Sequence, residues 1–283
     1  MSSKDLITTA QNTWCPGCGN FTIQFALRNA IKGLVADGVP LENIVLVTGI
    51  GCHAKIGDYL DINSFYSIHG RTIPVATGIK LANPDLTVIC CAGDGDAYAE
   101  GLDHLIFGAK RNSDITVIVH NNRVYGLTTG QYTPTSPLGF RGRSTPQGTP
   151  EEPFNPISLM LASGAGFVAR STTRKMPHLS GIIGQALRHK GFSFVDVLQI
   201  CATYFNVSEL YDRQGYELSG HDPADFQAAC RKAEEWNYNT DAPIAFGLFY
   251  QEKKPCFEDR FSRHPPSFGG REEQIRAFLE TKR

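Results

Sequence analysis

The sequence predicts an α/β protein in which a parallel sheet is covered by helices on both faces. Short apolar runs rich in β-branched residues alternate with segments whose apolar residues recur at helical spacing. Such runs are typical of strands buried on both faces, as in a parallel sheet whose connecting helices pack on both sides. The 283 residues can bury a sizeable core, and 41% hydrophobic with 19% charged residues is the composition of an ordinary globular protein.

The individual elements follow from these patterns in chain order. A helix is expected from Phe21 to Ala36, after a loop rich in Pro, Gly and Cys. Strands are expected at Asn43–Thr48, Leu86–Cys91, Ile115–His120 and Ser193–Ile200. Further helices are expected at Ala97–Arg111, Asn155–Ala165 and Pro177–Lys190.

Residues 1–235 are expected to form one domain, and residues 236–283 a tail or arm. A charged helix at Ala224–Glu235 and an apolar run at Ile244–Tyr250 precede the Pro- and Gly-rich end of the chain. We expect this arm to pack on the domain or on a partner subunit. The loop from Thr128 to Pro153 is long for a compact domain, and long Pro- and Gly-rich loops are more often functional than idle.

Charge and composition exclude two classes of function. The net charge is −1 and the chain has no basic stripe, so nucleic-acid binding is not expected. No stretch reaches the roughly 18 apolar residues of a spanning helix, and the N-terminus has no apolar signal region. The expected location is therefore the cytoplasm, where disulfides are rare, so the eight cysteines indicate metal or redox chemistry.

Polar residues follow two of the expected strands. Gly93-Asp94-Gly95 comes directly after one strand, and Asn121-Asn122 after the next. The interval between them holds one helix and one strand, so Asp94 and Asn122 should lie at the carboxyl ends of neighbouring parallel strands. Oxygen ligands at that position suit Mg²⁺ with a diphosphate, whereas Gly-Asp-Gly alone would be read as a turn.

Two cysteines, Cys15 and Cys18, are close enough in sequence for both sulfurs to reach one metal centre. A zinc site or a redox dithiol would use the same spacing. Cys52 and Cys201 each follow an expected strand, so they should lie at the same edge of the sheet as Asp94. The remaining cysteines are interpreted as core residues, Cys90 and Cys91, or as incidental, Cys230 and Cys256.

These motifs together carry a family resemblance. Gly93-Asp94-Gly95-Asp96 and Asn121-Asn122, followed by Val124-Tyr125-Gly126-Leu127-Thr128, resemble the thiamine diphosphate motif of the 2-oxoacid:ferredoxin oxidoreductase family. The resemblance covers roughly residues 12–207. Gln131, Pro134 and Thr135 also fit the pattern, while Thr129 stands where some relatives carry a basic residue.

The resemblance implies a thiamine diphosphate-binding fold and a role for each matching residue. Asp94, Asn122 and the Val124 carbonyl correspond to the Mg²⁺ ligands, and Leu127 to the residue beneath the bent cofactor. Other implied cofactor contacts are Ile50, Gly51, Gly93, Gly95, Asp96 and Thr128.

The same resemblance implies one [4Fe–4S] cluster and two residues near the substrate. The implied cluster ligands are Cys15, Cys18, Cys52 and Cys201. Lys55 resembles the family's lysine for the substrate carboxylate, and His69 belongs to a signature near the cofactor, as a proton carrier or as a structural turn residue. The role of His53 stays open.

The implied activity is the oxidative decarboxylation of a 2-oxoacid with coenzyme A, with electrons passed to ferredoxin. The implied partner is an alpha subunit that supplies the glutamate for the aminopyrimidine and the coenzyme A site, in an α2β2 assembly. Among the residues of this chain, Glu100 is left open for that glutamate role.

The substrate and two other functions remain alternatives. The resemblance favours 2-oxoglutarate, with pyruvate and branched-chain 2-oxoacids as alternatives. A non-catalytic iron–sulfur or zinc module with a thiamine-type fold is a second hypothesis. A thiamine decarboxylase or synthase without a cluster is a third, and it would leave Cys15 and Cys18 without a use.

Overall fold

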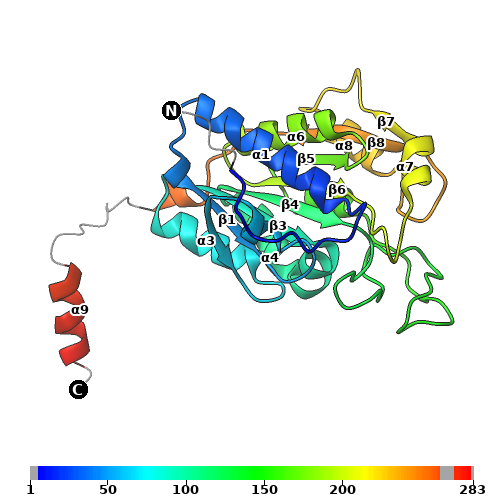
Figure 1. Cartoon of the computed structure of the whole chain (residues 1–283). Helices are drawn as coiled ribbons and strands as arrows, with labels where there is room; N and C mark the ends of the chain where they lie inside the picture. The colour runs from blue at the N-terminus through cyan, green and yellow to red at the C-terminus, as the bar shows by residue number, and fades with distance from the viewer. Residues whose placement is uncertain (1–5, 262–270, 282–283) are drawn as a thin grey trace.

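The computed structural model describes residues 6–261 and 271–281 (Figure 1). In this part of the chain, eight strands form one sheet in the order β2-β1-β3-β4-β6-β5-β8-β7. Their bounds are β1 (Ile44–Thr48), β2 (Asn63–Tyr66), β3 (Thr87–Gly93), β4 (Ile115–Asn121), β5 (Phe167–Thr172), β6 (Ser193–Leu198), β7 (Gly215–Glu217) and β8 (Ile244–Gln251). Strands β1 to β6 run parallel, and β8 pairs with β5 in the antiparallel direction. The α/β fold class predicted from sequence is confirmed.

Helices cover the sheet on both faces. The helices in the described part of the chain are α1 (Asn20–Ala36), α2 (Ile56–Tyr59), α3 (Thr72–Ala82), α4 (Leu102–Arg111), α5 (Pro156–Ala162), α6 (Met176–Arg188), α7 (Ser208–Gln214), α8 (Phe226–Ala233) and α9 (Arg271–Glu280), with short 3₁₀ turns η1 (Leu41–Asn43) and η3 (Glu258–Arg260). Helices α1, α2 and α6 pack on one face, and α3, α4, α5 and α8 on the other. No described helix has the length and apolar character needed to cross a membrane.

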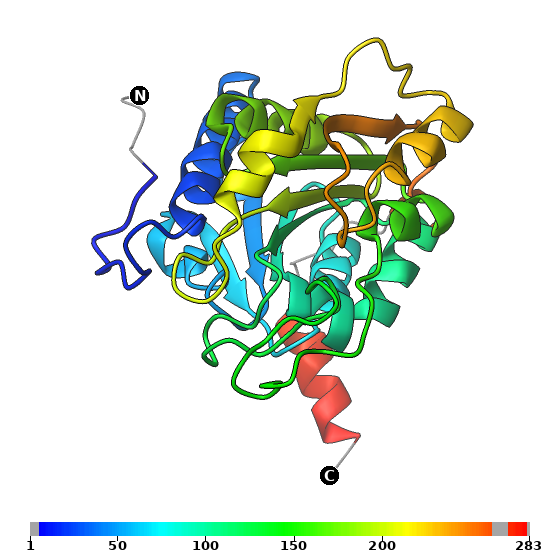
Figure 2. The same cartoon turned by 90° about the vertical axis from the view of Figure 1, so that its right-hand side faces the viewer.

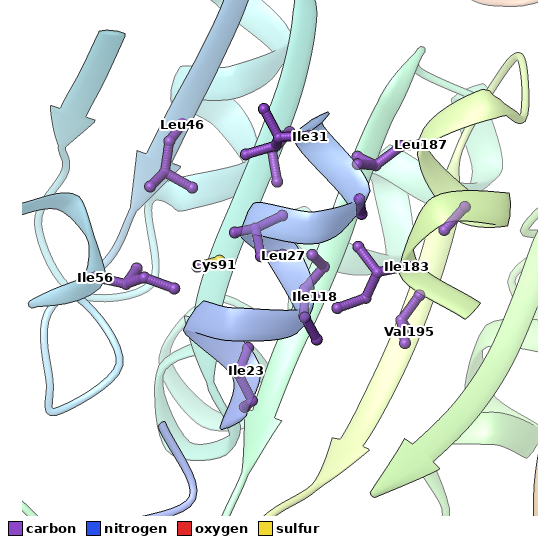
Figure 3. Packing of buried hydrophobic residues seen from close by; sticks show 14 of the residues in the cluster. Ile23, Leu27, Ile31, Leu46, Ile56, Cys91, Ile118, Ile183, Leu187 and Val195 are labelled. Carbon is purple, nitrogen blue, oxygen red and sulfur yellow. The ribbon is translucent and has the colours of Figure 1, made fainter. Parts of the chain in front are cut away.

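The face under α1 shows why these residues form a core. Ile23, Leu27 and Ile31 are spaced four residues apart, so they lie along one side of α1 and point at the sheet (Figure 3). They meet Ile183 of α6 and the buried side chain of Cys91 in β3. Cys90, the preceding residue, points to the opposite face, so both thiols are core residues as predicted.

Three strands, β2, β5 and β7, have no counterpart in the sequence prediction, and for the first two the reason is physical. The residues of β2 are all exposed at the sheet edge, so this strand carries no apolar run. Strand β5 is fully buried yet contains Arg170, whose charge interrupts the apolar pattern. That charge is accommodated by Asp196 of β6, with 3.7 Å between Arg170 Nε and Asp196 Oδ2.

The helix predicted at Ala97–Arg111 is divided in two. A π-helical turn, η2 (Asp96–Glu100), precedes α4, and Gly101 separates them. A Cβ on Gly101 would lie 2.7 Å from the Gly70 carbonyl oxygen, so the loop before α3 packs against the backbone at the break. A π-turn inside a helix is a feature often found beside functional sites.

The segment after residue 235 is continuous with the sheet. Trp236 and Tyr238 are buried, and β8 contributes Ile244 and Phe246 to the same cluster. Strand β8 pairs with β5, so residues 244–251 of the expected arm lie within the sheet. The predicted features at Pro265, Pro266, Gly269 and Gly270 lie outside the described residues. Figure 1 shows α9 apart from the sheet.

Candidate cofactor and cluster site

The carboxyl ends of four adjacent strands carry the residues singled out from sequence. Strands β1, β3, β4 and β6 are neighbours in the sheet and run parallel. Gly51 and Cys52 follow β1, Asp94 follows β3, Asn122 follows β4 and Cys201 follows β6. The segment before α1, the green loop after β4 and the yellow segment after β6 lie together at the lower left of Figure 2. The predicted arrangement of strand ends is confirmed.

Asp94 is a buried carboxylate held by two hydroxyl groups. Thr133 and Thr135 donate hydrogen bonds to its Oδ2 at 2.6 and 3.1 Å. Burial raises the pKa of Asp94 to about 6, because the effect of desolvation exceeds that of the hydroxyl donors. A carboxylate in this environment gains from a bound cation, which replaces the water it has lost.

The turn after β4 is closed by Asn122. Its Oδ1 accepts a hydrogen bond from the Val124 N–H at 3.0 Å, and Arg123 between them has a left-handed backbone with φ of 63°. Thr135 connects this turn with Asp94, because its hydroxyl lies 2.9 Å from Asn121 Oδ1 and 3.1 Å from Asp94 Oδ2.

A recess at this edge collects the residues expected to contact a cofactor. It encloses about 50 Å³. Its lining includes every predicted cofactor residue, which are Ile50, Gly51, Gly93, Asp94, Gly95, Asp96, Asn122, Val124, Leu127 and Thr128. Four buried polar atoms of the lining residues have no hydrogen-bond partner within the described chain. His53 Nε2 and Asp96 Oδ2 form an ion pair with each other at 3.3 Å, whereas Gln199 Oε1 and His120 Nε2 have no such partner. Such atoms are rare in folded proteins, and they point to a missing ligand or water.

A group of buried polar residues forms the back of the recess. His120 Nδ1 lies 2.8 Å from Asn20 Oδ1, and burial, together with nearby His53, holds the pKa of His120 well below its usual range. The Asp96 carboxylate accepts a hydrogen bond from the Gly70 N–H at 2.6 Å and lies 3.3 Å from His53 Nε2. Asp96 therefore lines the recess while its carboxylate is engaged with protein groups.

The N-terminal cysteine loop is attached to the strand ends at two points. The Trp14 indole N–H donates to the Cys52 carbonyl at 2.7 Å, and the indole packs edge-on against Phe21 and Tyr59. Further along the loop, the Gly19 N–H bonds the Ile200 carbonyl at 3.4 Å. The loop that carries Cys15 and Cys18 is thereby placed between the ends of β1 and β6.

All four predicted cysteine ligands line one cavity of about 220 Å³. Burial, followed by the neighbouring cysteines, raises the pKa of Cys18 to about 11, and burial also raises the pKa of Cys52. These thiols would ionise readily only when a metal holds their sulfurs. Within residues 6–261 and 271–281, no three His, Cys, Asp or Glu side chains gather closely enough to hold a single metal ion.

The two predicted substrate-side residues lie at different openings. Lys55 lines the cysteine cavity and donates to the Thr13 hydroxyl at 2.9 Å. His69 lines the recess, is 56% exposed, and has its Nδ1 3.3 Å from Glu100 Oε2. The Tyr125 hydroxyl donates to the other Glu100 oxygen at 3.2 Å, so this carboxylate is held between a phenol and an imidazole.

Sequence analysis missed several residues of the site. Thr133, Gln199 and His120 contact Asp94 or line the recess, yet each is an ordinary residue type in its local pattern. For Thr133 a signal existed, since it lies in the same loop as Thr135. His120 and Gln199 could have been found from their places at the ends of β4 and β6.

Family models match most of the chain. Residues 49–197 match the thiamine pyrophosphate enzyme C-terminal TPP-binding domain, and residues 201–264 match the C-terminal part of the pyruvate ferredoxin oxidoreductase beta subunit. The chain is also 42% identical over 275 residues to the 2-oxoacid:ferredoxin oxidoreductase subunit beta of Saccharolobus solfataricus, covering 91% of this chain and 88% of the relative. This chain belongs to the family of 2-oxoacid:ferredoxin oxidoreductase beta subunits.

Two further similarities are to proteins whose names refer to 2-oxoglutarate. The 2-oxoglutarate synthase subunit KorB of Methanothermobacter thermautotrophicus is 45% identical over 192 residues, which are 68% of this chain and 66% of that one. Among solved structures, the 2-oxoglutarate:ferredoxin oxidoreductase from Magnetococcus marinus with 2-oxoglutarate, coenzyme A and succinyl-CoA bound superposes with a TM-score of 0.87. That chain is 31% identical, and the match covers 97% of this beta subunit and 96% of that chain.

Proposed function

We propose that this chain is the beta subunit of an enzyme that decarboxylates a 2-oxoacid oxidatively, with coenzyme A as acyl acceptor and ferredoxin as electron acceptor. One observation carries the proposal: the recess around Asp94 and the cavity of the four cysteines adjoin each other. They share Cys52, Asn122, Gly126 and Leu127 as lining residues. A cofactor and a cluster bound there would be separated by little more than one stretch of backbone.

The residues of the recess fit the diphosphate end of thiamine diphosphate with Mg²⁺. Asp94, Asn122 and the Val124 carbonyl offer the hard oxygen ligands that Mg²⁺ prefers. Both threonine hydroxyls bond Asp94 Oδ2, which leaves Oδ1 available to the ion. The unpartnered Gln199 Oε1 and His120 Nε2 support the fit, because a bound ligand can satisfy them. Bound thiamine diphosphate would supply the electron sink that a 2-oxoacid needs to lose CO₂.

The cysteine cavity fits a [4Fe–4S] cluster better than zinc. One zinc ion has Zn–S distances of about 2.3 Å and draws its four sulfurs close together. No such gathering occurs among the described side chains, although all four cysteines line one cavity. A cubane spreads its cysteine ligands over four iron atoms and suits this wider arrangement. The neighbouring Asn20 Nδ2, buried and unpartnered within the described chain, could donate to a cluster sulfide.

Lys55 is proposed to bind the carboxylate of the substrate. It follows Cys52 at the end of β1 and lines the cavity shared with Asn122 and Leu127, so its ammonium group lies near both predicted sites. The names of relatives favour 2-oxoglutarate, while one matching family model is named for pyruvate. Pyruvate and branched-chain 2-oxoacids are therefore the competing substrates that an assay must include.

The partner is proposed to be an alpha subunit in an α2β2 assembly in the cytoplasm. The recess of about 50 Å³ is too small for a whole cofactor, so the remaining part would be bound by another chain. Glu100 does not line the recess and is held by Tyr125 and His69, which do, and this arrangement argues for an aminopyrimidine glutamate supplied by the alpha subunit. The alpha subunit would also supply the coenzyme A site.

The test is to copurify the beta subunit with its native alpha subunit under anaerobic conditions. We expect about four iron atoms per beta chain. Ferredoxin reduction should depend on coenzyme A and be fastest with 2-oxoglutarate in a panel containing pyruvate and a branched-chain 2-oxoacid. Cys201→Ser should lower the iron content, whereas Cys230→Ser in α8 is the matched control and should not. One zinc and no iron per chain would remove the electron-transfer part of the proposal.

A further inference from the structure

Arg123 adopts a backbone conformation that an arginine rarely takes by itself. Its φ of 63° lies in the left-handed region, and it stands between Asn122 and Val124, the two predicted Mg²⁺ ligands of the turn after β4. A residue with a side chain persists in this region only when its surroundings impose it. The arginine side chain supplies that constraint.

The Arg123 guanidinium is buried and bonded at two points. The residue is only 2% exposed. Nε donates to the Thr135 carbonyl at 2.7 Å, and a terminal nitrogen donates to the Tyr238 carbonyl. The guanidinium also lies 5.5 Å from the Trp236 ring centroid and 5.6 Å from that of Phe205. Carbonyl dipoles and aromatic faces thus compensate the buried charge.

These contacts connect the turn to the loop that holds Asp94. Thr135, whose carbonyl accepts from Arg123, places its hydroxyl 3.1 Å from Asp94 Oδ2. In the reverse direction, the Ser136 hydroxyl donates to the Arg123 carbonyl at 2.6 Å. Arg123 therefore fixes two chain segments relative to each other: the turn with Asn122 and Val124, and the loop that orients Asp94.

The far end of this contact lies in the segment after α8. Tyr238 also has a positive φ, of 65°, and its ring stacks on Trp236 with centroids 4.2 Å apart. The Tyr238 carbonyl, presented by this turn, is an acceptor for Arg123. Residues 236–238 thus hold Arg123 although they are far from the diphosphate motif in sequence.

We propose that Arg123 is a positioning residue for the metal–diphosphate site: anchored by Thr135 and by residues 236–238, it imposes the turn that presents Asn122 and the Val124 carbonyl to the metal ion. The inference rests on the proposed function, because it presupposes that these oxygens bind the ion. Arg123 itself touches neither metal nor substrate. Its role is to exclude other conformations of the turn.

Two substitutions separate the effect of the Arg123 side-chain hydrogen bonds from the effect of backbone strain. Arg123→Gly allows a φ of 63° without strain but removes both hydrogen bonds of the guanidinium. The turn can then still form, but nothing holds it in this conformation. Arg123→Lys keeps the charge, but one ammonium group cannot reproduce the two-point contact of a guanidinium. Lys80→Met is the matched control. It removes a buried cation from α3 that is paired with Asp114, just before the start of β4 and so at the opposite edge of the sheet.

The experiment measures Mn²⁺ binding to the complete alpha–beta complex in the presence of thiamine diphosphate. The electron paramagnetic resonance signal of free Mn²⁺ reports how much of the ion remains unbound. We expect the Mn²⁺ dissociation constant to rise about 10- to 100-fold in Arg123→Gly, as for other residues that orient metal ligands. A smaller rise is expected in Arg123→Lys, and none in Lys80→Met. Iron content should stay unchanged in all three variants.

The outcomes test the positioning role of Arg123 separately from the proposed function. If the wild-type complex binds Mn²⁺ and both Arg123 variants bind it with the same dissociation constant, the positioning role is overturned and the proposed function stays intact. A wild-type complex that binds no Mn²⁺ with thiamine diphosphate would overturn both. If Arg123→Gly fails to assemble, the comparison between Arg123→Lys and Lys80→Met decides the question.

Discussion

Gly19 offers a direct test of how the cysteine loop is attached to the sheet. It precedes α1, and its φ of −61° is open to any residue, so replacement by alanine introduces no backbone strain. A Cβ at this position would lie 2.9 Å from Gln199 Cβ and 3.2 Å from the Ile200 backbone nitrogen. The contact with Gln199 Cβ is about 0.5 Å closer than ordinary van der Waals distance. Both contacted atoms are part of the backbone after β6 or directly attached to it.

The expected cost follows from that overlap. Because the backbone after β6 cannot rotate away, the start of α1 must shift, and overpacking of this kind destabilises by about 1–3 kcal/mol. For a chain of this size each 1 kcal/mol lowers Tm by about 2–4 °C. The shift also moves Cys18 away from Cys201, so Gly19→Ala should hold less iron per chain after anaerobic purification.

The control is a glycine inside a helix with free space around it. Gly78 lies inside α3, and a Cβ there would meet nothing within 4 Å. Gly78→Ala should therefore stabilise the protein by about 0.5–1 kcal/mol through helix propensity, with unchanged iron content. A Gly19→Ala protein with the wild-type Tm and full iron content would refute the reasoning about the attachment.

Three further predictions concern separate contacts. Trp14→Phe removes the N–H that bonds the Cys52 carbonyl at 2.7 Å and should lower stability by about 1 kcal/mol. The absorbance of the proposed cluster should then bleach faster in air than in the wild type. Thr133→Val removes one of the two hydroxyl donors of Asp94 and should weaken Mn²⁺ binding about tenfold, with Thr133→Ser restoring it. Asp114→Asn leaves buried Lys80 without its counter-ion and should lower the free energy of unfolding, measured in urea at pH 7, by about 3–5 kcal/mol. In the double variant Asp114→Asn with Lys80→Met this loss should be smaller, because the buried charge is removed as well. Burial opposes ionisation of Asp114, but Lys80 and Lys190 outweigh it and hold the pKa of Asp114 below its usual range. The stability difference between wild type and Asp114→Asn should therefore persist above about pH 4 and shrink at lower pH, as acid protonates the carboxylate.

The sequence was most informative where one physical requirement determined the pattern. Buried parallel strands need continuous apolar runs, so β1, β3, β4 and β6 could be found, and with them the edge where their carboxyl ends meet. Asp94, Asn122, Cys52 and Cys201 could then be assigned to that edge from their sequence positions alone, because parallel strands all end on the same side.

Other features depend on partners far along the chain, and local patterns cannot reveal them. The exposed edge strand β2 forms because β1 offers it a free edge, and Arg170 is tolerated in β5 because Asp196 lies on the next strand. The positive φ of Arg123 is imposed by Tyr238, more than a hundred positions away. Sequence spacing predicts which strand end a residue follows, but it does not predict the side-chain contacts that orient it.

Gly126 shows why the two predicted sites can lie so close to each other. A Cβ on this residue would lie 3.5 Å from Cys201 Sγ, 3.7 Å from Cys52 Sγ and 3.8 Å from Asn122 Nδ2. The two cysteine sulfurs and the side chain expected to bind Mg²⁺ therefore surround the same open side of Gly126. These are ordinary contact distances, so an alanine methyl group would fit here, whereas a larger side chain would extend into the space between the two predicted sites. The glycine of the Val124-Tyr125-Gly126 motif thus keeps the space between the two predicted sites free of any side chain, a role different from the conformational freedom for which glycines are usually retained.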